Sequence, residues 1–176
     1  MPAPGSVLPP YRFLTKIIAE AAGAVALSAT LYFLRLYTFT AGGSITPASM
    51  VPVLLLSFRR GVRVGVLAGI VLGLVVLIME TFVVHPIQLL LDYPLAFGAL
   101  GVAGLFRNRP MLGVIIGIGS RFASHFISGL VFFTTFNLDG VVYSAVYNGS
   151  YLVPEFIICT VVIQILVQRK ALYLYL

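Results

Sequence analysis

The stretch VGVLAGIVLGLVVLIMETFVV, residues 64–84, carries one ionisable side chain, Glu80, in 21 positions. A helix needs roughly 20 mostly apolar residues to cross the hydrocarbon core of a bilayer, so this stretch predicts a membrane-spanning helix. Five other apolar segments surround it, at residues 13–34, 48–58, 87–106, 111–133 and 141–167. The segment at 48–58 is too short to cross alone, so we expect it to be extended from Ser44, tilted or partly re-entrant.

The composition leaves no room for a second kind of domain. Of the 176 residues, 60% are hydrophobic and 9% are charged, and the mean hydropathy is +1.09. We therefore expect an all-α membrane protein, a six-transmembrane-helix bundle formed by residues 12–170 as a single domain, with short tails at 1–11 and 171–176. The single cysteine, Cys159, excludes a disulfide framework and a multi-cysteine metal site.

The basic residues set the predicted orientation. With a cytoplasmic N-terminus, nine of the eleven lysines and arginines fall on the cytoplasmic side, while Arg35 lies in an outer loop and Arg121 inside a span. The positive-inside rule then predicts a multi-pass protein of the cell membrane with both termini cytoplasmic. Because topology explains the net charge of +6, we expect no nucleic-acid partner.

Several polar side chains lie at membrane depth, where an unpaired charge is costly and indicates a partner or a cavity. Asp92 and His125 each lie 14 residues from the cytoplasmic ends of their helices, which is about 21 Å for both. Asn148, Tyr151 and Glu155 share one face of the last span by their helical spacing. These groups predict a polar ligand pocket in the outward half of the bundle.

Arg121 and Glu155 lie at similar heights, about 15 and 20 Å above their inner helix ends, and predict a structural ion pair between the last two helices. This pair leaves Asp92 without an evident cationic partner, so Asp92 favours a cationic ligand. Protonation, a structural hydrogen bond or pairing with a protonated His125 are the alternatives. Glu80, near an outer helix end, is interpreted as solvated and receives no binding role.

Two further features have two interpretations each. The first outer loop, TAGGSITP at residues 40–47, is rich in helix breakers and predicts either a lid over the pocket or an ordinary connector. Ala22 and Ala26 on the first helix are small residues four positions apart, which allow another helix to approach closely. They serve either internal packing or the docking of a partner helix.

Four motifs carry a resemblance to a known family. They are Gly42, Gly43 and Ser44 followed by MVP at 50–52, HPIQLLLDYPLAF at 85–97, SRFASHFISGLVFF at 120–133 and YSAVYNGSYLVPEFI at 143–157. Together they resemble the ThiT family, the thiamine-specific substrate-binding subunits of energy-coupling factor vitamin transporters. The resemblance extends over most of the chain from Gly42 onward. It implies a six-helix membrane fold, an outer loop that closes the pocket and high-affinity thiamine binding.

The resemblance also implies ligand-contact roles at particular positions. These are Asp92, Tyr93, His125, Gly129, Phe133, Tyr143 and Asn148. The chemistry of thiamine fits them, because its thiazolium ring is cationic and both of its rings have flat faces suited to aromatic contact. Phe133 stands where the family uses an aromatic stacking residue, and the chain contains no tryptophan. We expect His125 to be neutral when thiamine is bound, since a protonated ring would repel the cation.

The chain has no GxxxxGK[ST] motif, so ATP hydrolysis must be supplied by other subunits. The resemblance implies a transmembrane coupling subunit that contacts Ala22 and Ala26, and two ATPase subunits. We therefore expect a transport subunit that is not an enzyme and needs no cofactor. The alternatives are a subunit for a precursor such as hydroxymethylpyrimidine, an intramembrane enzyme using Asp92 and His125 as acid and base, or a purely structural subunit.

Overall fold

The computed structural model describes residues 10–39, 43–80 and 82–169. Its α-helices are α1 (Pro10–Phe33), α2 (Val51–Arg60), α3 (Val62–Met79), α4 (Pro86–Leu90), α5 (Ala96–Ala99), α6 (Pro110–Phe132) and α7 (Leu138–Gln168). A π-helical turn, Leu91–Leu95, joins α4 to α5, and a 3₁₀ segment, Leu100–Phe106, continues α5. A short antiparallel hairpin of β1 (Tyr37–Thr38) and β2 (Ser44–Ile45) follows α1. The predicted tails fall outside the described residues apart from positions 10 and 11, so the domain boundaries remain a prediction.

Each of the six predicted apolar segments contains a helix. Five described helices are long and apolar enough to cross a membrane: Phe13–Phe33, Val62–Met79, Pro86–Phe106, Pro110–Phe132 and Leu138–Gln168. The remaining one, α2, has 10 residues, about 15 Å of helix, and its neighbours bury most of them. These findings confirm the all-α membrane bundle and a second segment too short to cross alone.

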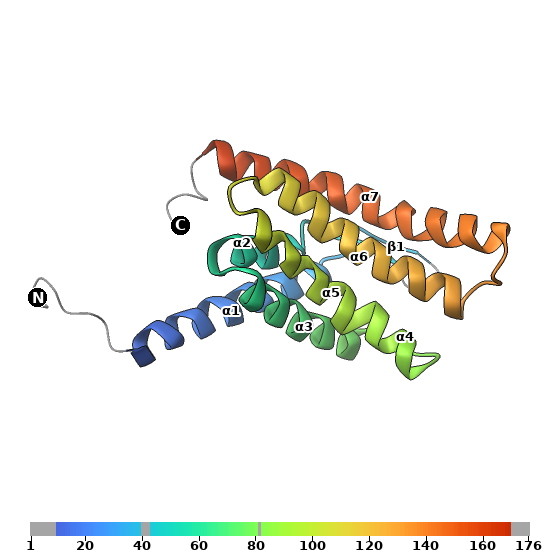
Figure 1. Ribbon diagram of the computed structural model, residues 1–176, viewed down its shortest axis with the longest axis horizontal. Coiled ribbons are helices and arrows are strands. Elements are labelled where there is room, and N and C mark those ends of the chain that lie inside the picture. The colour runs from blue at the N-terminus through green and yellow to red at the C-terminus, as the bar shows by residue number, and fades with distance from the viewer. Residues whose placement is uncertain (1–9, 40–42, 81, 170–176) are drawn as a thin grey trace, which may run out of the picture.

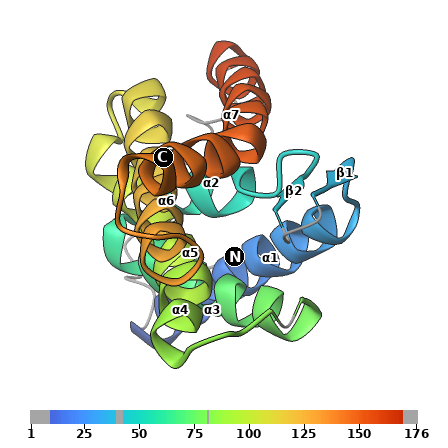
Figure 2. The same cartoon turned by 90° about the vertical axis from the view of Figure 1, so that its right-hand side faces the viewer.

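The helices pack as a bundle in which α6 and α7 run side by side (Figure 1). The π turn, α5 and the 3₁₀ segment lie between α6 and α3, and α1 packs against α2 and α3. α1 begins and α7 ends at the same end of the bundle. The end-on view in Figure 2 shows the β hairpin beside α1 and α7, and β2 contacts α7.

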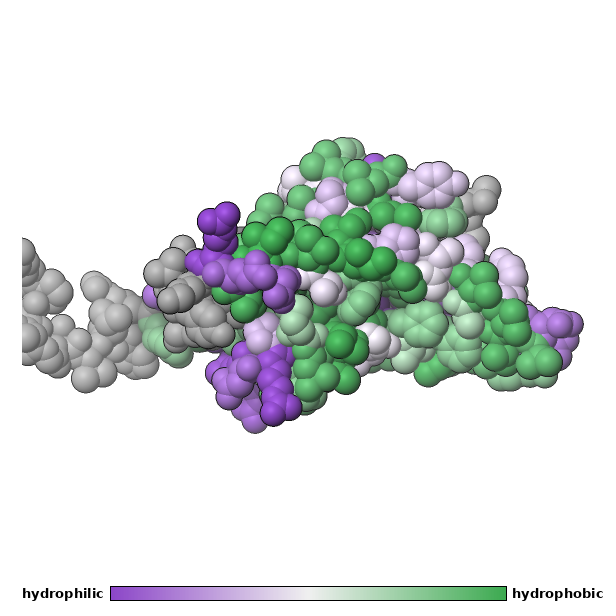
Figure 3. Space-filling view, turned by 90° about the horizontal axis from the view of Figure 1, so that it is seen from above, coloured by the Kyte–Doolittle hydropathy of each residue, from purple (hydrophilic) through white to green (hydrophobic). Residues whose placement is uncertain are grey.

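Charged and apolar side chains are segregated along the bundle. Figure 3 shows apolar residues over the middle of the face it views, with strongly hydrophilic residues gathered mainly at the end where α1 begins. At that end Glu20 accepts hydrogen bonds from Arg60 Nε and Nη2 at 2.6 and 2.7 Å, and Arg59 Nη2 lies 3.1 Å from its carboxylate. An apolar middle with a basic end is what the positive-inside rule requires of a membrane bundle.

A π-helical turn interrupts the fourth span at Leu91–Leu95. Pro94 lies inside this turn and has no backbone N–H, so it cannot donate a helical hydrogen bond. In the same turn, Ser124 Oγ on α6 donates to the carbonyl oxygen of Leu91 at 2.6 Å, which ties the turn to α6. Single π turns inside α-helices are frequently found at functional sites. This one contains Asp92.

Glycines let α3 lie directly against the fourth span. A Cβ atom added at Gly69 would lie 2.2 Å from the carbonyl oxygen of Phe97, and one added at Gly101 would lie 2.2 Å from the backbone nitrogen of Val66. We call these close approaches the glycine seam, formed by Gly65, Gly69 and Gly73 on α3 and by Gly101 on the facing segment. Small residues of this kind allow the backbones of membrane helices to touch.

Candidate functional site

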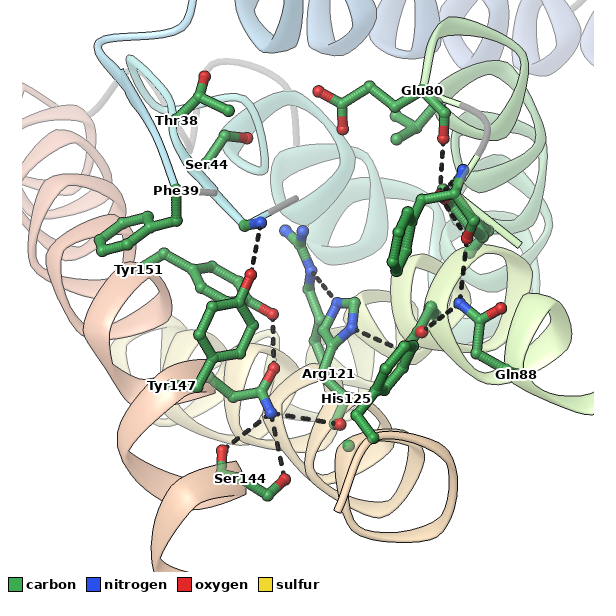
Figure 4. A pocket seen from close by; sticks show the side chains of 18 of the residues that line it. Thr38, Phe39, Ser44, Glu80, Gln88, Arg121, His125, Ser144, Tyr147 and Tyr151 are labelled. Atoms are coloured by element: carbon green, nitrogen blue, oxygen red, sulfur yellow. Dashed lines mark hydrogen bonds and ion pairs between the residues drawn. The ribbon is translucent and has the colours of Figure 1, made fainter. Parts of the chain in front are cut away.

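A cavity of about 440 Å³ lies between the β hairpin and helices α1, α3, α4, α6 and α7 (Figure 4). All of the predicted ligand-contact residues line it: Asp92, Tyr93, His125, Gly129, Phe133, Tyr143 and Asn148. The lid residues Gly43 and Ser44 also line it, whereas Gly42 lies outside the described residues. Its volume falls in the range of about 300–1,000 Å³ that is typical of small-molecule sites. The structure thus places all of the predicted ligand-contact residues, and the described lid residues, around one cavity.

The Asp92 carboxylate is held by three neighbouring side chains. Gln88 Nε2 and Ser128 Oγ donate to its Oδ2 at 2.6 and 2.9 Å, and His125 Nδ1 lies 3.1 Å from its Oδ1. The amide of Gln88 and the hydroxyl of Ser128 carry no charge, so they fix the carboxylate without cancelling its negative charge. The Asp92 side chain remains 17% exposed, and its negative charge is therefore available to a ligand.

The hydrogen bonds of His125 define its tautomer. Arg121 Nε lies 3.4 Å from His125 Nε2, and a guanidinium N–H is always a donor. Nε2 therefore accepts, and the ring proton belongs on Nδ1, where it points to Asp92. This arrangement uses a neutral imidazole.

Arg121 and Glu155 meet next to the cavity. Arg121 Nη1 lies 3.5 Å from Glu155 Oε2, and the two side chains are 5% and 2% exposed. The backbone N–H of Thr46 donates to Glu155 Oε1 at 3.0 Å, and the Thr46 hydroxyl donates to the same oxygen. Pairing and hydrogen bonding of this kind are needed when charges leave water. The pair joins α6 to α7 and ties the segment after β2 to α7.

The Asn148 amide is oriented by its own helix. Its Nδ2 donates to the carbonyl oxygen of Ser144 at 2.9 Å, and its Oδ1 accepts from the hydroxyl of Tyr151 at 2.7 Å. All three residues are buried, so this polar face of the last span lies inside the bundle. These bonds fix which edge of the amide faces the cavity.

Tyr147 is a cavity residue that sequence reasoning missed. It lies four positions from both Tyr143 and Tyr151, and its ring stacks on Tyr143 with the ring centroids 6.1 Å apart. Its hydroxyl accepts a hydrogen bond from the backbone N–H of Gly43 at 2.8 Å. The available signal was the spacing of the three tyrosines at i, i+4 and i+8, which places them on one helical face. The described part of the lid therefore rests on α7.

The predicted aromatic contacts differ in what they offer a ligand. Phe133 and Tyr143 are 41% and 54% exposed, and Phe133 stacks on Phe82 with the centroids 5.9 Å apart. Tyr93 is buried, and its hydroxyl donates to the carbonyl oxygen of Glu80 at 2.7 Å. Tyr93 thus holds the segment after α3 in place while it also lines the cavity.

The structure corrects the interpretation of Glu80 as a solvated residue. Its carboxylate forms an ion pair with Arg35 and accepts a hydrogen bond from the hydroxyl of Tyr32 at 2.8 Å. All three residues line the cavity. Sequence reasoning missed them because Glu80 and Arg35 follow different helices, and no helical period relates two such positions.

Ala22 and Ala26, the predicted docking residues, do not line the cavity. Both are exposed on α1, whose apolar span is only 6% buried. Their exposure argues against packing within the described part of this chain. In the residues that the structure describes, no group of three or more His, Cys, Asp or Glu side chains is placed to hold a metal ion.

The fold and the cavity together define a class, namely multi-pass helical membrane proteins that enclose a small polar ligand between their helices. Comparison with known proteins identifies the family within that class. The family model described as thiamine transporter protein matches residues 18–174, and the chain belongs to this family.

Similar proteins agree with the family assignment. The chain is 41% identical over 145 residues to the thiamine transporter ThiT of Bacillus subtilis (strain 168), an alignment that covers 71% of this chain and 75% of that protein. It is 30% identical over 140 residues to ThiT of Lacticaseibacillus paracasei, with 66% and 70% covered. A solved structure of ThiT from Listeria monocytogenes has the same fold, with a TM-score of 0.78 at 23% identity over 89% of this chain and 96% of that one. These findings confirm the resemblance seen in the motifs, the multi-pass membrane setting and a transporter rather than an enzyme.

Proposed function

We propose that this chain captures thiamine from the outer side of the cell membrane, as the substrate-binding subunit of an energy-coupling factor importer. Membership of the thiamine transporter family supports the transport role. Two relatives that bear the name thiamine transporter align with about two thirds or more of the chain. The observation that carries the choice of ligand is the charge of the cavity.

The cavity and the ion pair beside it carry one net negative charge. They contain three carboxylates and two guanidinium groups: Asp92, Glu80, Glu155, Arg35 and Arg121. The neutral imidazole of His125 adds no charge. Because an uncompensated charge away from water is costly, the favoured occupant is a monovalent cation. Thiamine fits this requirement, since its thiazolium ring carries one permanent positive charge.

In this proposal Asp92 faces the thiazolium cation and Asn148 hydrogen-bonds a polar edge of the aminopyrimidine. His125 does the same through Nε2, in exchange for its contact of 3.4 Å with Arg121 Nε. The aromatic contacts that orient the two rings are Tyr93, Phe133 and Tyr143. Phe133 and Tyr143 present exposed faces on which a flat cationic ring can stack. The backbone at Gly129 leaves room for Ser144 and Asn148, because an added Cβ would lie 2.4 Å from Ser144 Oγ.

The test of this function is a calorimetric titration of the purified chain with thiamine. We expect saturable binding at one site per chain. Hydroxymethylpyrimidine lacks the thiazolium charge and should bind at least about tenfold more weakly, and riboflavin should not bind. Absence of thiamine binding would contradict the proposal. Equal affinity for hydroxymethylpyrimidine would assign the chain to a thiamine precursor instead.

We further propose that energy comes from partner subunits, with both termini cytoplasmic and a transmembrane coupling subunit contacting Ala22 and Ala26. The exposure of these alanines supports this role, because large side chains there would hold a partner helix away. Ala22→Trp and Ala26→Trp should abolish thiamine uptake in cells while thiamine binding is retained. The matched control is Ile115→Trp on the exposed side of α6, which should leave uptake unchanged. Normal uptake by both alanine variants would show that the docking surface lies elsewhere.

A further inference from the structure

A second charged cluster lines the cavity, apart from the Asp92 site. It consists of Arg35 just after α1, Glu80 just after α3, and Tyr32 in the last turn of α1. Arg35 pairs with one oxygen of the Glu80 carboxylate, while Tyr32 donates to the other at 2.8 Å. Figure 4 draws the Glu80 carboxylate across the cavity from Ser144 and Tyr147. The cavity therefore has two separate carboxylate sites, each with its own set of partners.

The two carboxylates differ in their nearest cation. Glu80 is paired with a permanent cation, whereas the Asp92 oxygens are bonded by an amide, a hydroxyl and an imidazole. Asp92 is thus the carboxylate that a cationic ring can neutralise, and the Arg35–Glu80 pair is already neutral. The Arg35 side chain is 28% exposed, so this pair lies at a solvent-accessible part of the cavity lining. Such a position suits the part of a ligand that carries variable substituents.

We propose that Arg35 and Glu80 form a specificity site for the hydroxyethyl tail of thiamine, which accepts the neutral hydroxyl and disfavours its phosphate ester. This inference rests on the proposed function. A phosphate monoester carries a charge of about −1.5 to −2 at neutral pH, so beside Glu80 it meets like charge. Near Arg35 it has to share the guanidinium with the Glu80 carboxylate that is already paired with it, and this competition is the basis of the discrimination.

The residues in the cluster have opposite effects on a phosphorylated ligand. Without Glu80, the guanidinium of Arg35 is free to bind phosphate oxygens, which arginine does in a bidentate manner. Without Arg35, the Glu80 carboxylate loses its neutralising partner and repels phosphate more strongly. The proposal therefore predicts the sign of each change.

The experiment compares the dissociation constants of thiamine and thiamine monophosphate for the purified full chain, by calorimetry. Wild type should bind thiamine at least about tenfold more tightly. Glu80→Gln, which keeps the shape of the side chain, should reduce this ratio at least about tenfold, and Arg35→Gln should raise it. Arg109→Gln, the same charge change at an exposed residue outside the cavity lining, is the matched control, and its ratio should stay within about twofold of wild type.

A second measurement needs no variant. The acetyl ester of thiamine is neutral but enlarges the same tail, so wild type should bind it more tightly than the phosphate ester. If both esters are disfavoured equally, size rather than charge decides, and the proposal is overturned. It is also overturned if Glu80→Gln and Arg35→Gln leave the ratio within about twofold of wild type while thiamine still binds. That result leaves the thiamine function intact, whereas a wild type that does not bind thiamine refutes the function itself and this inference with it.

Discussion

Two regions of the molecule are built in different ways: the base of the bundle, where α2 packs against α3 and the 3₁₀ segment, and the region around the cavity. In the base, Leu54, Phe58 and Leu100 are fully buried, and the glycine seam brings helix backbones into contact. Around the cavity, the π turn carries Asp92 and α7 carries Asn148. Hydrogen bonds to other side chains and to a backbone carbonyl hold these two polar side chains in place. The difference teaches that close packing in the base can hold the helices in fixed positions. The polar side chains on those helices can then line an open cavity without themselves being close-packed.

The largest effect is expected when the negative charge of Asp92 is removed from the cavity. Asp92→Asn keeps the shape of the side chain but leaves the thiazolium ring without its counter-charge. We expect thiamine affinity to fall about 100-fold, in the range found when one member of a desolvated charge pair is neutralised. Calorimetric titration measures it. Asp139→Asn, the same change in the exposed first turn of α7, is the control and should bind as wild type does. Equal affinity in the two variants would remove the electrostatic part of the proposed mechanism.

The second prediction disturbs the glycine seam in the base of the bundle. Gly101→Ala places a Cβ atom 2.2 Å from the backbone nitrogen of Val66, and backbone cannot move aside as a side-chain end does. We expect a loss of about 1–3 kcal/mol in the free energy of unfolding, seen as a lower midpoint of thermal unfolding in detergent. At Gly119, on an exposed part of α6, an added Cβ meets nothing within 4 Å. Gly119→Ala is therefore the control, and an equal loss there would show that the seam is not special.

The third prediction adds the same methyl group beside the cavity. A Cβ at Gly129 would lie 2.4 Å from Ser144 Oγ and 3.2 Å from Asn148 Nδ2, so Gly129→Ala displaces the amide that we assign to the ligand. Thiamine affinity should fall roughly tenfold, or about 1.4 kcal/mol. The loss of thermal stability should be smaller than in Gly101→Ala, because only side-chain atoms must move. Unchanged affinity together with lower stability would assign Gly129 to packing alone.

The spans and the levels of the polar groups could be predicted because a bilayer imposes long apolar runs and a helix rises by a fixed amount per residue. Counting residues along two helices put Asp92 and His125 at one height in the membrane. In the structure His125 Nδ1 lies 3.1 Å from Asp92 Oδ1. The same count placed Arg121 near Glu155, and their charged atoms lie 3.5 Å apart.

Other parts of the site could not be predicted, for physical reasons. An apolar run does not reveal an extra residue in one turn, so the π turn had only Pro94 as a local signal. The contact between Arg35 and Glu80 depends on how two connections fold over the bundle, and neither obeys a helical period. Tyr147 could have been found from its spacing to the neighbouring tyrosines, since that spacing is helical.

The smallest expected effect concerns the contact between the lid and α7. Tyr147→Phe removes the hydroxyl that accepts from the backbone of Gly43, a bond of about 0.5–1.5 kcal/mol. We expect thiamine to dissociate roughly threefold faster in stopped-flow measurements, with little change in association. Tyr37→Phe, in the exposed strand β1, is the control and should not alter the rate. If dissociation from Tyr147→Phe is unchanged, this hydrogen bond does not hold the loop over bound ligand.

The length of α7 has a consequence for the lipid around the protein. Its 31 residues extend about 46 Å, whereas the hydrocarbon core of a bilayer is roughly 30 Å thick. A helix of this length has to tilt or reach into the headgroup layer, and the acyl-chain length of the lipid changes how far it does so. Because α7 carries Tyr147, Asn148 and Glu155, bilayer thickness becomes a physical variable of vitamin capture, adjustable by reconstitution in short-chain or long-chain lipids without any change to the protein.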